Sequence, residues 1–300
     1  MKKELTFIGL GRMGAAMTKH LVEDGYSVHG FDVSEPTRRA LVECGVSVHD
    51  SIEAAIHAQS VAPKLIWLMV PAKFVDDVIA EVTPHLSAGD TIVDGGNSFF
   101  KDSVRRHHDV HEKGIHFIDC GTSGGVDGAR FGASLMAGGE KEVVEQYREL
   151  FESLAITDGF GHVGGPGAGH FVKMIHNGIE YGMMGAIAEG MNVLHEHKSA
   201  LTLDMSQVLK PYEHGSIIQS NLMSWLADAY QTDGYLDRIA GEVPRGETEM
   251  EMEYVIEHQD VWVLEAALNQ RKHTRENPSF IGTLISAMRN QFGGHKTIEK

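Results

Sequence analysis

The first fourteen residues constrain the fold of this chain more than any other stretch. A strand-like apolar run at residues 5–10 leads into the sequence GLGRMG, and a helix-like run continues to residue 24. In this strand–turn–helix setting, glycines at G-x-G-x-x-G spacing allow a tight turn and bring backbone N–H groups close to a pyrophosphate. The anion then lies at the positive N-terminal end of the helix. We therefore predict a dinucleotide-binding turn formed by Gly9, Leu10, Gly11, Arg12, Met13 and Gly14.

The residue that ends the second strand indicates which dinucleotide is bound. Residues 27–31 form a strand-like run, and Asp32 follows at the distance expected for the carboxylate that binds an adenine ribose hydroxyl. A carboxylate here would repel the 2′-phosphate of NADP, so we expect NAD, with NADP less favoured. Arg38 and Arg39 lie on the following helix, from which one of them could reach a phosphate.

Strand-like and helix-like runs alternate through the first half of the chain. A helix-like run at 74–86 follows a buried strand at 64–70, and further strands are predicted at 91–94, 116–120, 134–139 and 155–163. This alternation predicts an α/β, Rossmann-type, doubly wound parallel sheet, which we assign to residues 1–165. Residues 166–300 form an all-α domain for substrate binding and oligomerisation, with amphipathic runs at 171–197, 205–214, 219–230 and 261–271.

Three loops that follow predicted strands are expected to line one cleft, because such sheets bind ligands beyond the carboxyl ends of their strands. Asn97 offers an amide to a nicotinamide or a hydroxyl, or it caps the next helix. The sequence Ser123-Gly124-Gly125 forms either a backbone nest for an anion or an ordinary glycine turn. The expected cofactor contacts in these loops are Met69, Val70, Pro71 and Asn97.

The long helix that begins near residue 167 carries polar residues in one row. Lys173, His176, Asn177 and Glu180 lie at i, i+3, i+4 and i+7, and therefore on one helix face. The row is either a set of catalytic groups or a solvated face with a weak Lys–Glu pair. Glycines inside the helix cost helix propensity, which indicates tight packing or a nearby ligand; they are Gly178, Gly182 and Gly185.

Composition excludes several classes of partner. The net charge of −16 argues against nucleic acid or an anionic membrane. The only two cysteines are far apart in the sequence, and no signal peptide or membrane-spanning run is evident, so we expect a cytoplasmic protein. We expect no metal site, and we place His107, His108 and His111 on a solvated helix face.

Several stretches together resemble one enzyme family. The sequence GAGHFVKMIHNGIEY at residues 167–181 resembles the catalytic-helix motif of 6-phosphogluconate dehydrogenase (decarboxylating), and DGGNS, the segment that begins SGG, and RNQFGGH near the end match further motifs of that family. The resemblance implies oxidative decarboxylation of 6-phosphogluconate to ribulose 5-phosphate and CO2, with Lys173 as the base and Glu180 as the acid. The implied substrate contacts are Asn97, Ser123, Gly124, Gly125, His176, Asn177, Tyr181, Arg271, Arg289 and His295.

The chain also departs from the family pattern. It has Asp32-Val33-Ser34 where NADP-dependent members tend to carry Asn-Arg-Thr/Ser, which favours NAD. It has room for only one helical half, as in short members, so we expect a homo-oligomer, a dimer or tetramer, whose C-terminal tail completes the neighbour's site. The family's substrate-contact segment is not reproduced at residues 241–253, so contacts from it are not carried over.

Two other functions remain compatible with the sequence. A related β-hydroxyacid dehydrogenase for a small unphosphorylated hydroxy acid would keep the glycine turn and Lys173, but it would require neither Glu180 nor the C-terminal arginines. A catalytically silent NAD-binding regulator would need only the turn. Without the resemblance, Arg271 and Arg289 are interpreted as exposed cations at helix C-termini.

Overall fold

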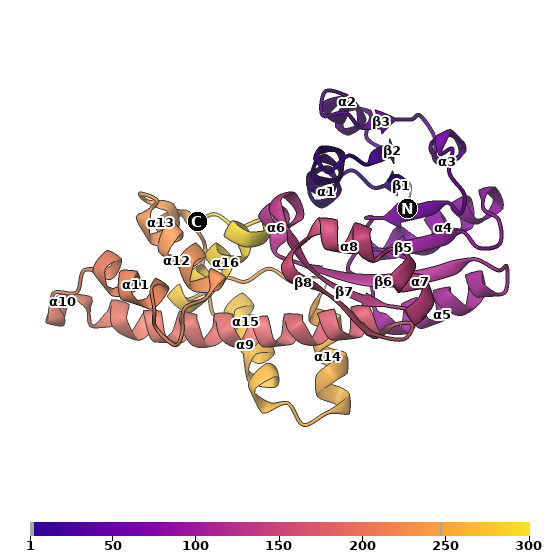
Figure 1. Cartoon of the computed structure of the whole chain (residues 1–300). Helices are drawn as coiled ribbons and strands as arrows, with labels where there is room; N and C mark the ends of the chain where they lie inside the picture. The colour runs from indigo at the N-terminus through magenta and orange to yellow at the C-terminus, as the bar shows by residue number, and fades with distance from the viewer. Residues whose placement is uncertain (1–2, 247) are drawn as a thin grey trace. The chain divides into compact units, whose positions relative to one another are not determined.

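A computed structural model describes residues 3–246 and 248–300 of the chain (Figure 1). The chain divides into two compact units, one ending at Met174 and the other spanning Ile175–Lys300. We call them the sheet unit and the helical unit. The predicted division after residue 165 stays a prediction. Within the described parts of the chain, no helix has both the length and the apolar character that crossing a membrane requires.

The sheet unit is built on one eight-stranded sheet with the strand order β3-β2-β1-β4-β5-β6-β7-β8. Its strands agree closely with those predicted, apart from the short β3, for which the sequence shows no distinct run. The strands are β1 (Glu4–Ile8), β2 (Ser27–Phe31), β3 (Ser47–Val48), β4 (Leu65–Leu68), β5 (Thr91–Asp94), β6 (His116–Ser123), β7 (Ala133–Gly138) and β8 (Ala155–Gly164).

The direction of the last two strands differs from our prediction of a parallel sheet. Strands β3 to β6 pair in parallel, but β6 and β7 pair antiparallel, with Asp119 opposite Gly138 and Ser123 opposite Ser134. The connection between them, residues 124–132, is too short for a parallel crossover, which needs a dozen or more residues. Strand β8 then pairs in parallel with β7.

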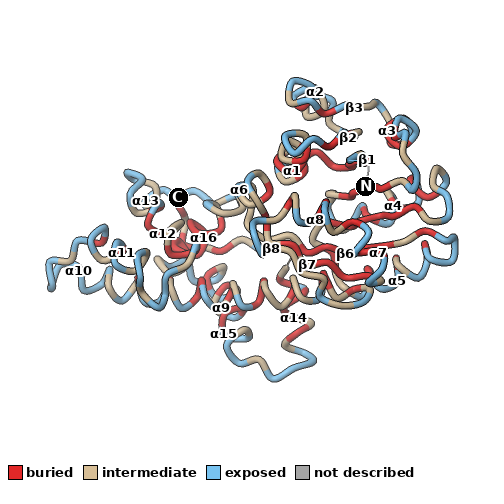
Figure 2. Tube along the Cα trace, viewed as in Figure 1, coloured by how far each residue is buried: buried red, intermediate tan, exposed pale blue. Residues whose placement is uncertain are grey.

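Helices cover both faces of this sheet, and apolar side chains alternate between the two layers. Phe7 and Trp67 pack into one cluster with Phe151, whereas Ile66 and Phe117 pack into the other. Figure 2 shows the strands as a largely buried layer. The helices of this unit are α1 (Arg12–Glu23), α2 (Glu35–Val42), α3 (Ile52–Ala58), α4 (Ala72–Val82), the 3₁₀ turn η1 (Thr83–His85), α5 (Phe100–His111), α6 (Gly125–Phe131), α7 (Lys141–Gln146) and α8 (Arg148–Leu154).

The helical unit follows along helix α9 (Ala168–Glu196), whose first residues belong to the sheet unit. A Cβ at Gly178 would lie 2.7 Å from Leu264 Cδ2, and one at Gly185 would lie 2.7 Å from Gln270 Oε1. Gly178 therefore leaves room for the packed side chain of Leu264, and Gly185 for the end of the Gln270 side chain, which supports the packing alternative. The other helices are α10 (Lys198–Leu201), α11 (Met205–Glu213), α12 (Asn221–Gln231), α13 (Tyr235–Arg238), α14 (Thr248–His258), α15 (Trp262–Glu276) and α16 (Phe280–Gly293).

Candidate active site

The glycine turn has the geometry that its sequence predicts. Gly9 has a φ of 94°, in the left-handed region that favours glycine, and a Cβ there would lie 2.5 Å from Met69 O. A Cβ at Gly14 would overlap Gly9 O, so helix α1 and the turn touch through backbone. At Gly11, by contrast, no atom lies within 4 Å of the position of a Cβ. The turn thus has open space at Gly11, where a pyrophosphate would approach the first residues of α1.

Asp32 is fixed directly beside this turn. Its carboxylate accepts hydrogen bonds from the backbone N–H groups of Leu10 and Ser34, both at 2.8 Å. The arginines on α2 are occupied: Arg38 donates to Asp32 O at 2.6 Å and approaches Asp50, and Arg39 pairs with Glu35. Both arginines thus have partners within the chain, and Arg38 contacts the backbone of Asp32 itself.

The loops after β4, β5 and β6 are joined into one rim. A Cβ at Gly96 would lie 2.9 Å from Val70 O, and Thr122 Oγ1 donates to Gly95 O at 3.3 Å. Asn97 is half-buried in this rim, in the loop that follows β5. The sheet unit therefore brings the loops that carry Met69, Val70, Pro71 and Asn97 together with the end of β6, where Ser123 lies.

Gly124 and Gly125 form the turn from β6 into α6. Their φ values are 114° and 64°, which a residue with a side chain adopts only at a cost. The turn itself therefore requires both glycines. Their predicted contact with the substrate stays a prediction.

Lys173 lies directly against strand β6. A Cβ at Gly121 would overlap Lys173 Cβ and lie 3.0 Å from Gly169 O, so the strand passes the start of α9 at backbone contact. Gly121 lies two residues before Ser123, at the end of β6 that carries the rim. A glycine inside a strand signals close backbone approach, and this signal in the sequence could have identified Gly121. We did not include it among the site residues.

The position of α9 is fixed by a buried carboxylate. Asp119 accepts hydrogen bonds from Gly167 N at 2.7 Å and from His170 N at 2.8 Å. Burial raises the pKa of Asp119, and the nearby His170 and these backbone N–H groups oppose that rise. His170 Nδ1 also lies 2.7 Å from Ser103 Oγ, which ties α9 to α5. The start of the helix that carries Lys173 is thus held at several points.

The polar row on α9 is not a solvated face. Asn177 is buried, and Lys173, His176 and Glu180 are only partly exposed. His176 Nδ1 lies 3.4 Å from Asn177 Oδ1 and 3.9 Å from a Glu180 carboxylate oxygen. An imidazole, an amide and a carboxylate are therefore close together on one side of this helix.

Two arginines of the helical unit are buried, not exposed as the alternative interpretation required. The Arg271 side chain stacks on the Tyr181 ring, with Cζ 3.2 Å from the ring centroid, and burial lowers the pKa of Arg271 to about 10. Arg289 donates to Pro244 O at 2.9 Å, and burial also lowers its pKa. Tyr181 contacts Thr248 through its hydroxyl at 2.5 Å.

The segment around Pro244 lies against Arg289 and Tyr181, although we had assigned no site residue to it from the sequence. A Cβ at Gly246 would lie 3.1 Å from the guanidinium of Arg289 and 3.9 Å from the Tyr181 hydroxyl. The turn signals of Pro244 and Gly246 were visible in the sequence, but the arginines that they cover are distant along the chain.

The C-terminal residues have several contacts within their own chain. Arg289 donates to Pro244 O, and Ala240 N donates to Ile298 O at 2.7 Å near the end of the chain. His295 is exposed, and its ring lies beside that of Phe292. Any contact of this tail with a second subunit stays a prediction.

The histidines of α5 also differ from expectation. His108 and His111 are exposed, but the His107 side chain is only 17% exposed and faces Glu140 together with His111. The predicted solvated face is therefore wrong for His107, because the β7–α7 connection covers it.

Two family models match most of this chain. Residues 4–164 match the NAD-binding domain of 6-phosphogluconate dehydrogenase, and residues 169–214 match the C-terminal domain of 6-phosphogluconate dehydrogenase. The chain is 39% identical to YqeC of Bacillus subtilis, by its name a candidate 6-phosphogluconate dehydrogenase, over 99% of this chain and all of that protein. It is 35% identical to the NAD(+)-dependent, decarboxylating 6-phosphogluconate dehydrogenase of Haloferax volcanii, over 99% of each.

Solved structures show the same fold in a longer enzyme and in an enzyme with another name. A Plasmodium falciparum 6-phosphogluconate dehydrogenase superposes with a TM-score of 0.80 at 28% identity, over 90% of this chain and 62% of that one. The 3-hydroxyisobutyrate dehydrogenase of Mycobacterium tuberculosis superposes with a TM-score of 0.73 at 20% identity, over 96% of this chain and all of that one. The second likeness concerns the fold alone.

Proposed function

The chain belongs to the 6-phosphogluconate dehydrogenase family, and we propose that it oxidises and decarboxylates 6-phosphogluconate, with NAD as the hydride acceptor. The products would be ribulose 5-phosphate, CO2 and NADH. The observation that carries this proposal is the placement of Lys173 against Gly121, two residues before Ser123 at the end of β6. A base in this place can reach a hydroxy acid held by the rim of the sheet unit.

The residues of the glycine turn fit a dinucleotide. Gly11 faces open space at the start of α1, and the Asp32 carboxylate is fixed next to Leu10 N. In the proposed complex, Gly9 to Gly14 hold the pyrophosphate, Asp32 binds the adenine ribose, and Met69 to Pro71 and Asn97 contact the remainder. The bound nicotinamide supplies an acceptor for the hydride. We infer NAD because Asp32 would repel a 2′-phosphate and both nearby arginines have other partners.

Lys173 and Glu180 have separate tasks in the proposed chemistry. As a neutral amine, Lys173 takes the proton of the 3-hydroxyl while hydride leaves C3. The resulting 3-keto acid then loses CO2, because the ketone accepts the electrons of the broken C–C bond. Lys173 returns its proton to the C3 oxygen, and Glu180 protonates C1 of the enediol. The two residues are two turns apart on α9, about 10.5 Å along the axis.

Other residues bind and orient the substrate in this proposal. Arg271 and Arg289 bind the phosphate, because a guanidinium donates several hydrogen bonds to one such group. Tyr181 stacks on Arg271 and fixes its plane. The remaining proposed contacts, from the family resemblance, are Asn97, Ser123, Gly124, Gly125, His176, Asn177 and His295.

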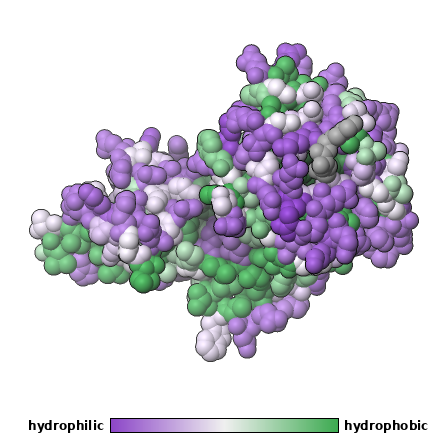
Figure 3. Space-filling model, in the orientation of Figure 1, coloured by the Kyte–Doolittle hydropathy of each residue, from purple (hydrophilic) through white to green (hydrophobic). Residues whose placement is uncertain are grey.

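We also propose that the enzyme works as a homo-oligomer in the cytoplasm. Figure 3 shows hydrophobic residues gathered over α9 and neighbouring helices of the helical unit. Large apolar side chains of the helical unit are exposed, among them Ile217, Trp262 and Val263. Both cysteines, Cys44 and Cys120, are free thiols, which suits a reducing compartment. A mixture of Lys173→Met and Arg289→Met proteins should exceed the summed activities of the two proteins assayed apart only if a site is shared between subunits.

Initial rates test the proposal directly. We expect the highest kcat/KM with 6-phosphogluconate and NAD, and much lower values with unphosphorylated hydroxy acids or with NADP. Turnover of a small hydroxy acid in preference to 6-phosphogluconate would replace this function by that of a β-hydroxyacid dehydrogenase. Tight NAD binding without turnover of either class would indicate a regulator.

A further inference from the structure

Glu140 is the centre of a histidine cluster in the sheet unit that includes none of the residues proposed for catalysis. Its carboxylate lies 3.9 Å from His107 Nε2 and 3.5 Å from His111 Nδ1 through one oxygen. The other oxygen lies 3.2 Å from His116 Nδ1. Two of these histidines come from α5, one starts β6, and Glu140 immediately precedes α7. Three separate elements thus direct donor atoms at one point.

Local structure holds these donors in place. His107 and His111 are four residues apart on α5, so their rings lie on one face, stacked with centroids 5.4 Å apart. The residue before Glu140 is held by strand β8: His162 Nε2 lies 3.0 Å from Gly139 O, and Gly139 N donates to Gly164 O at 3.0 Å. The backbone that leads into Glu140 is therefore anchored to β8. Only the three side chains need to adjust to a ligand.

The donor set suits a particular class of metal ion. Two imidazoles and a carboxylate are the ligands of zinc sites that keep a fourth position open, and they also suit other borderline divalent ions. Two ligands of a tetrahedral zinc ion lie about 3.3 Å apart, given metal–ligand distances of about 2.0–2.1 Å. Ligand atoms of His107, His111 and Glu140 all lie within 4.8 Å of one another, and two pairs are already close to that separation.

We propose that His107, His111 and Glu140 bind a zinc-class divalent cation, and that His116 positions the carboxylate through its second oxygen. The C-terminal end of α5, where His111 is the last helical residue, adds the negative end of the helix dipole. The cluster lies at the start of β6, whereas Ser123 ends that strand. The cation would therefore join α5, β6 and α7 and stabilise the sheet unit without contacting the substrate.

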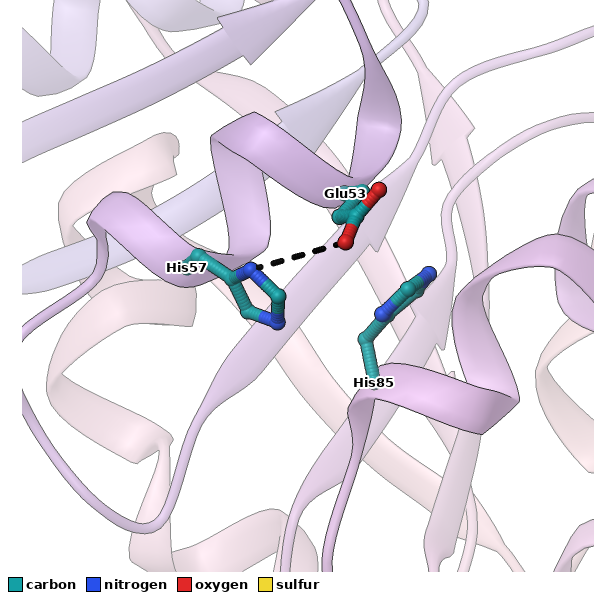
Figure 4. Close-up of side chains that lie close together, drawn as sticks. All are labelled: Glu53, His57 and His85. Atoms are coloured by element: carbon teal, nitrogen blue, oxygen red, sulfur yellow. Dashed lines mark ion pairs between the residues drawn. The ribbon is translucent and has the colours of Figure 1, made fainter.

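A second group of similar composition serves as the comparison. Glu53, His57 and His85 also present ligand atoms within 4.8 Å of one another (Figure 4). Here the carboxylate of Glu53 lies 3.9 Å from His57 Nδ1, and both side chains are more than half exposed. No hydrogen bond between described residues positions this carboxylate, in contrast to that of Glu140. We therefore assign the cation to the Glu140 cluster.

The test uses the full chain without a histidine tag, freed of metal by chelation and titrated with ZnCl2. Calorimetry should show one zinc ion per chain, and saturating zinc should raise Tm by about 3 °C or more. His111→Gln should weaken zinc binding at least tenfold and abolish the shift in Tm. Two controls should leave both readouts unchanged: His108→Gln, on the same helix, and His57→Gln, in the second group.

Three results would overturn the assignment: no saturable one-to-one binding, His111→Gln binding zinc as tightly as the unmodified chain, or loss of binding in His57→Gln. Glu140→Gln provides a second test and should also weaken binding. If that variant does not fold, His111→Gln decides alone, because its side chain is 57% exposed and its loss leaves no cavity. The inference does not depend on the proposed function, since both readouts are independent of turnover.

Discussion

Buried charge is compensated differently in the sheet unit and in the helical unit. In the sheet unit, Arg106 is buried against Asp94 at 3.3 Å and Asp76 at 2.7 Å, and Asp119 is held by two backbone N–H groups. In the helical unit, Arg271 stacks on Tyr181 and Arg289 donates to a carbonyl oxygen. Among the described residues, no carboxylate lies within ion-pair distance of either of these arginines.

The buried charges of the sheet unit are compensated within the unit, whereas the two buried arginines of the helical unit could still bind an anion. Burial lowers the pKa of both arginines although Glu180 and Glu249 oppose that change, so part of their desolvation cost is not offset, and an incoming anion would reduce it. The sheet unit has little need of such a partner, and its contacts serve to fix loops and the start of α9. The helical unit has two cations whose lowered pKa values record that cost. We therefore expect substitutions in the two units to affect different kinetic steps.

The largest expected effect separates Lys173, in the sheet unit, from Glu180, in the helical unit. Lys173→Met should lower the rate of hydride transfer by about 10² to 10⁴, because general acid–base groups contribute on that scale. Glu180→Gln should still form NADH in a first turnover and then stall after decarboxylation. Rapid-mixing absorbance of NADH, with CO2 release followed in parallel, measures both.

An exposed lysine of α11, Lys210, gives the matched control, and Lys210→Met should leave hydride transfer unchanged. Surviving hydride transfer in Lys173→Met would remove Lys173 from the role of base. Absence of first-turnover NADH in Glu180→Gln would mean that Glu180 acts before or during oxidation.

The next effect tests whether Arg271 and Arg289 bind the phosphate of the substrate. Arg271→Met or Arg289→Met should each raise KM for 6-phosphogluconate by about 10- to 100-fold, the scale of a lost charged hydrogen bond, with little change in KM for NAD. Steady-state kinetics with each substrate varied in turn measures this split. Arg238→Met, on an exposed arginine of the same unit, is the control. Equal increases in both KM values would show that the arginines hold the fold and not the phosphate.

A change of cofactor preference tests the sheet unit alone. The double substitution Asp32→Asn and Val33→Arg should shift the ratio of kcat/KM values toward NADP by about tenfold or more, since it removes a repelling carboxylate and adds a cation. Val33 is 90% exposed, so the arginine has room. Asp50→Asn, which alters only the exposed partner of Arg38, should leave the ratio unchanged. A native preference for NADP would contradict our interpretation of Asp32.

The smallest expected effect concerns the close contact behind Lys173. Gly121→Ala places a methyl group where Lys173 Cβ lies, so α9 must shift. Overpacking of this kind should lower the free energy of unfolding by about 1–3 kcal/mol and reduce kcat as well. Gly165→Ala is the control, because no atom lies within 4 Å of its Cβ position. Denaturant unfolding and kcat measurements would contradict the argument if both variants behaved alike.

The sequence was most informative where the signal is local. Strands β2 and β5 begin and end where predicted, because buried β-branched and aromatic runs between turn residues identify such strands. The antiparallel direction of β7 was not predictable from the alternation of strands and helices, because the spacing of apolar residues is the same in parallel and antiparallel strands. For helix α16 we predicted no bounds, although we placed Arg289 at a helix C-terminus; residues 282–289, polar ones included, are all buried.

The same distinction between local and long-range features applies to the candidate site. Gly9, Gly14 and Asp32 follow from spacing, and their geometry agrees with it. The contact of Gly121 with Lys173 and the cover of Pro244 over Arg289 join residues distant along the chain, which no local pattern encodes. The roles of Lys173, Glu180 and the arginines rest on the family resemblance and stay predictions.

The glycines of α9 limit how this protein could be made more heat-resistant. Replacing helix-interior glycine by alanine commonly adds about 0.5–1 kcal/mol of stability. At Gly178 the added methyl group would lie 2.7 Å from Leu264 Cδ2 and 2.9 Å from Met252 Sδ, so α14 and α15 would have to give way, whereas at Gly190 no atom lies within 4 Å of it. The same substitution should therefore destabilise the first half of the helix and stabilise the second, and a stabilising programme has to choose its glycine by position.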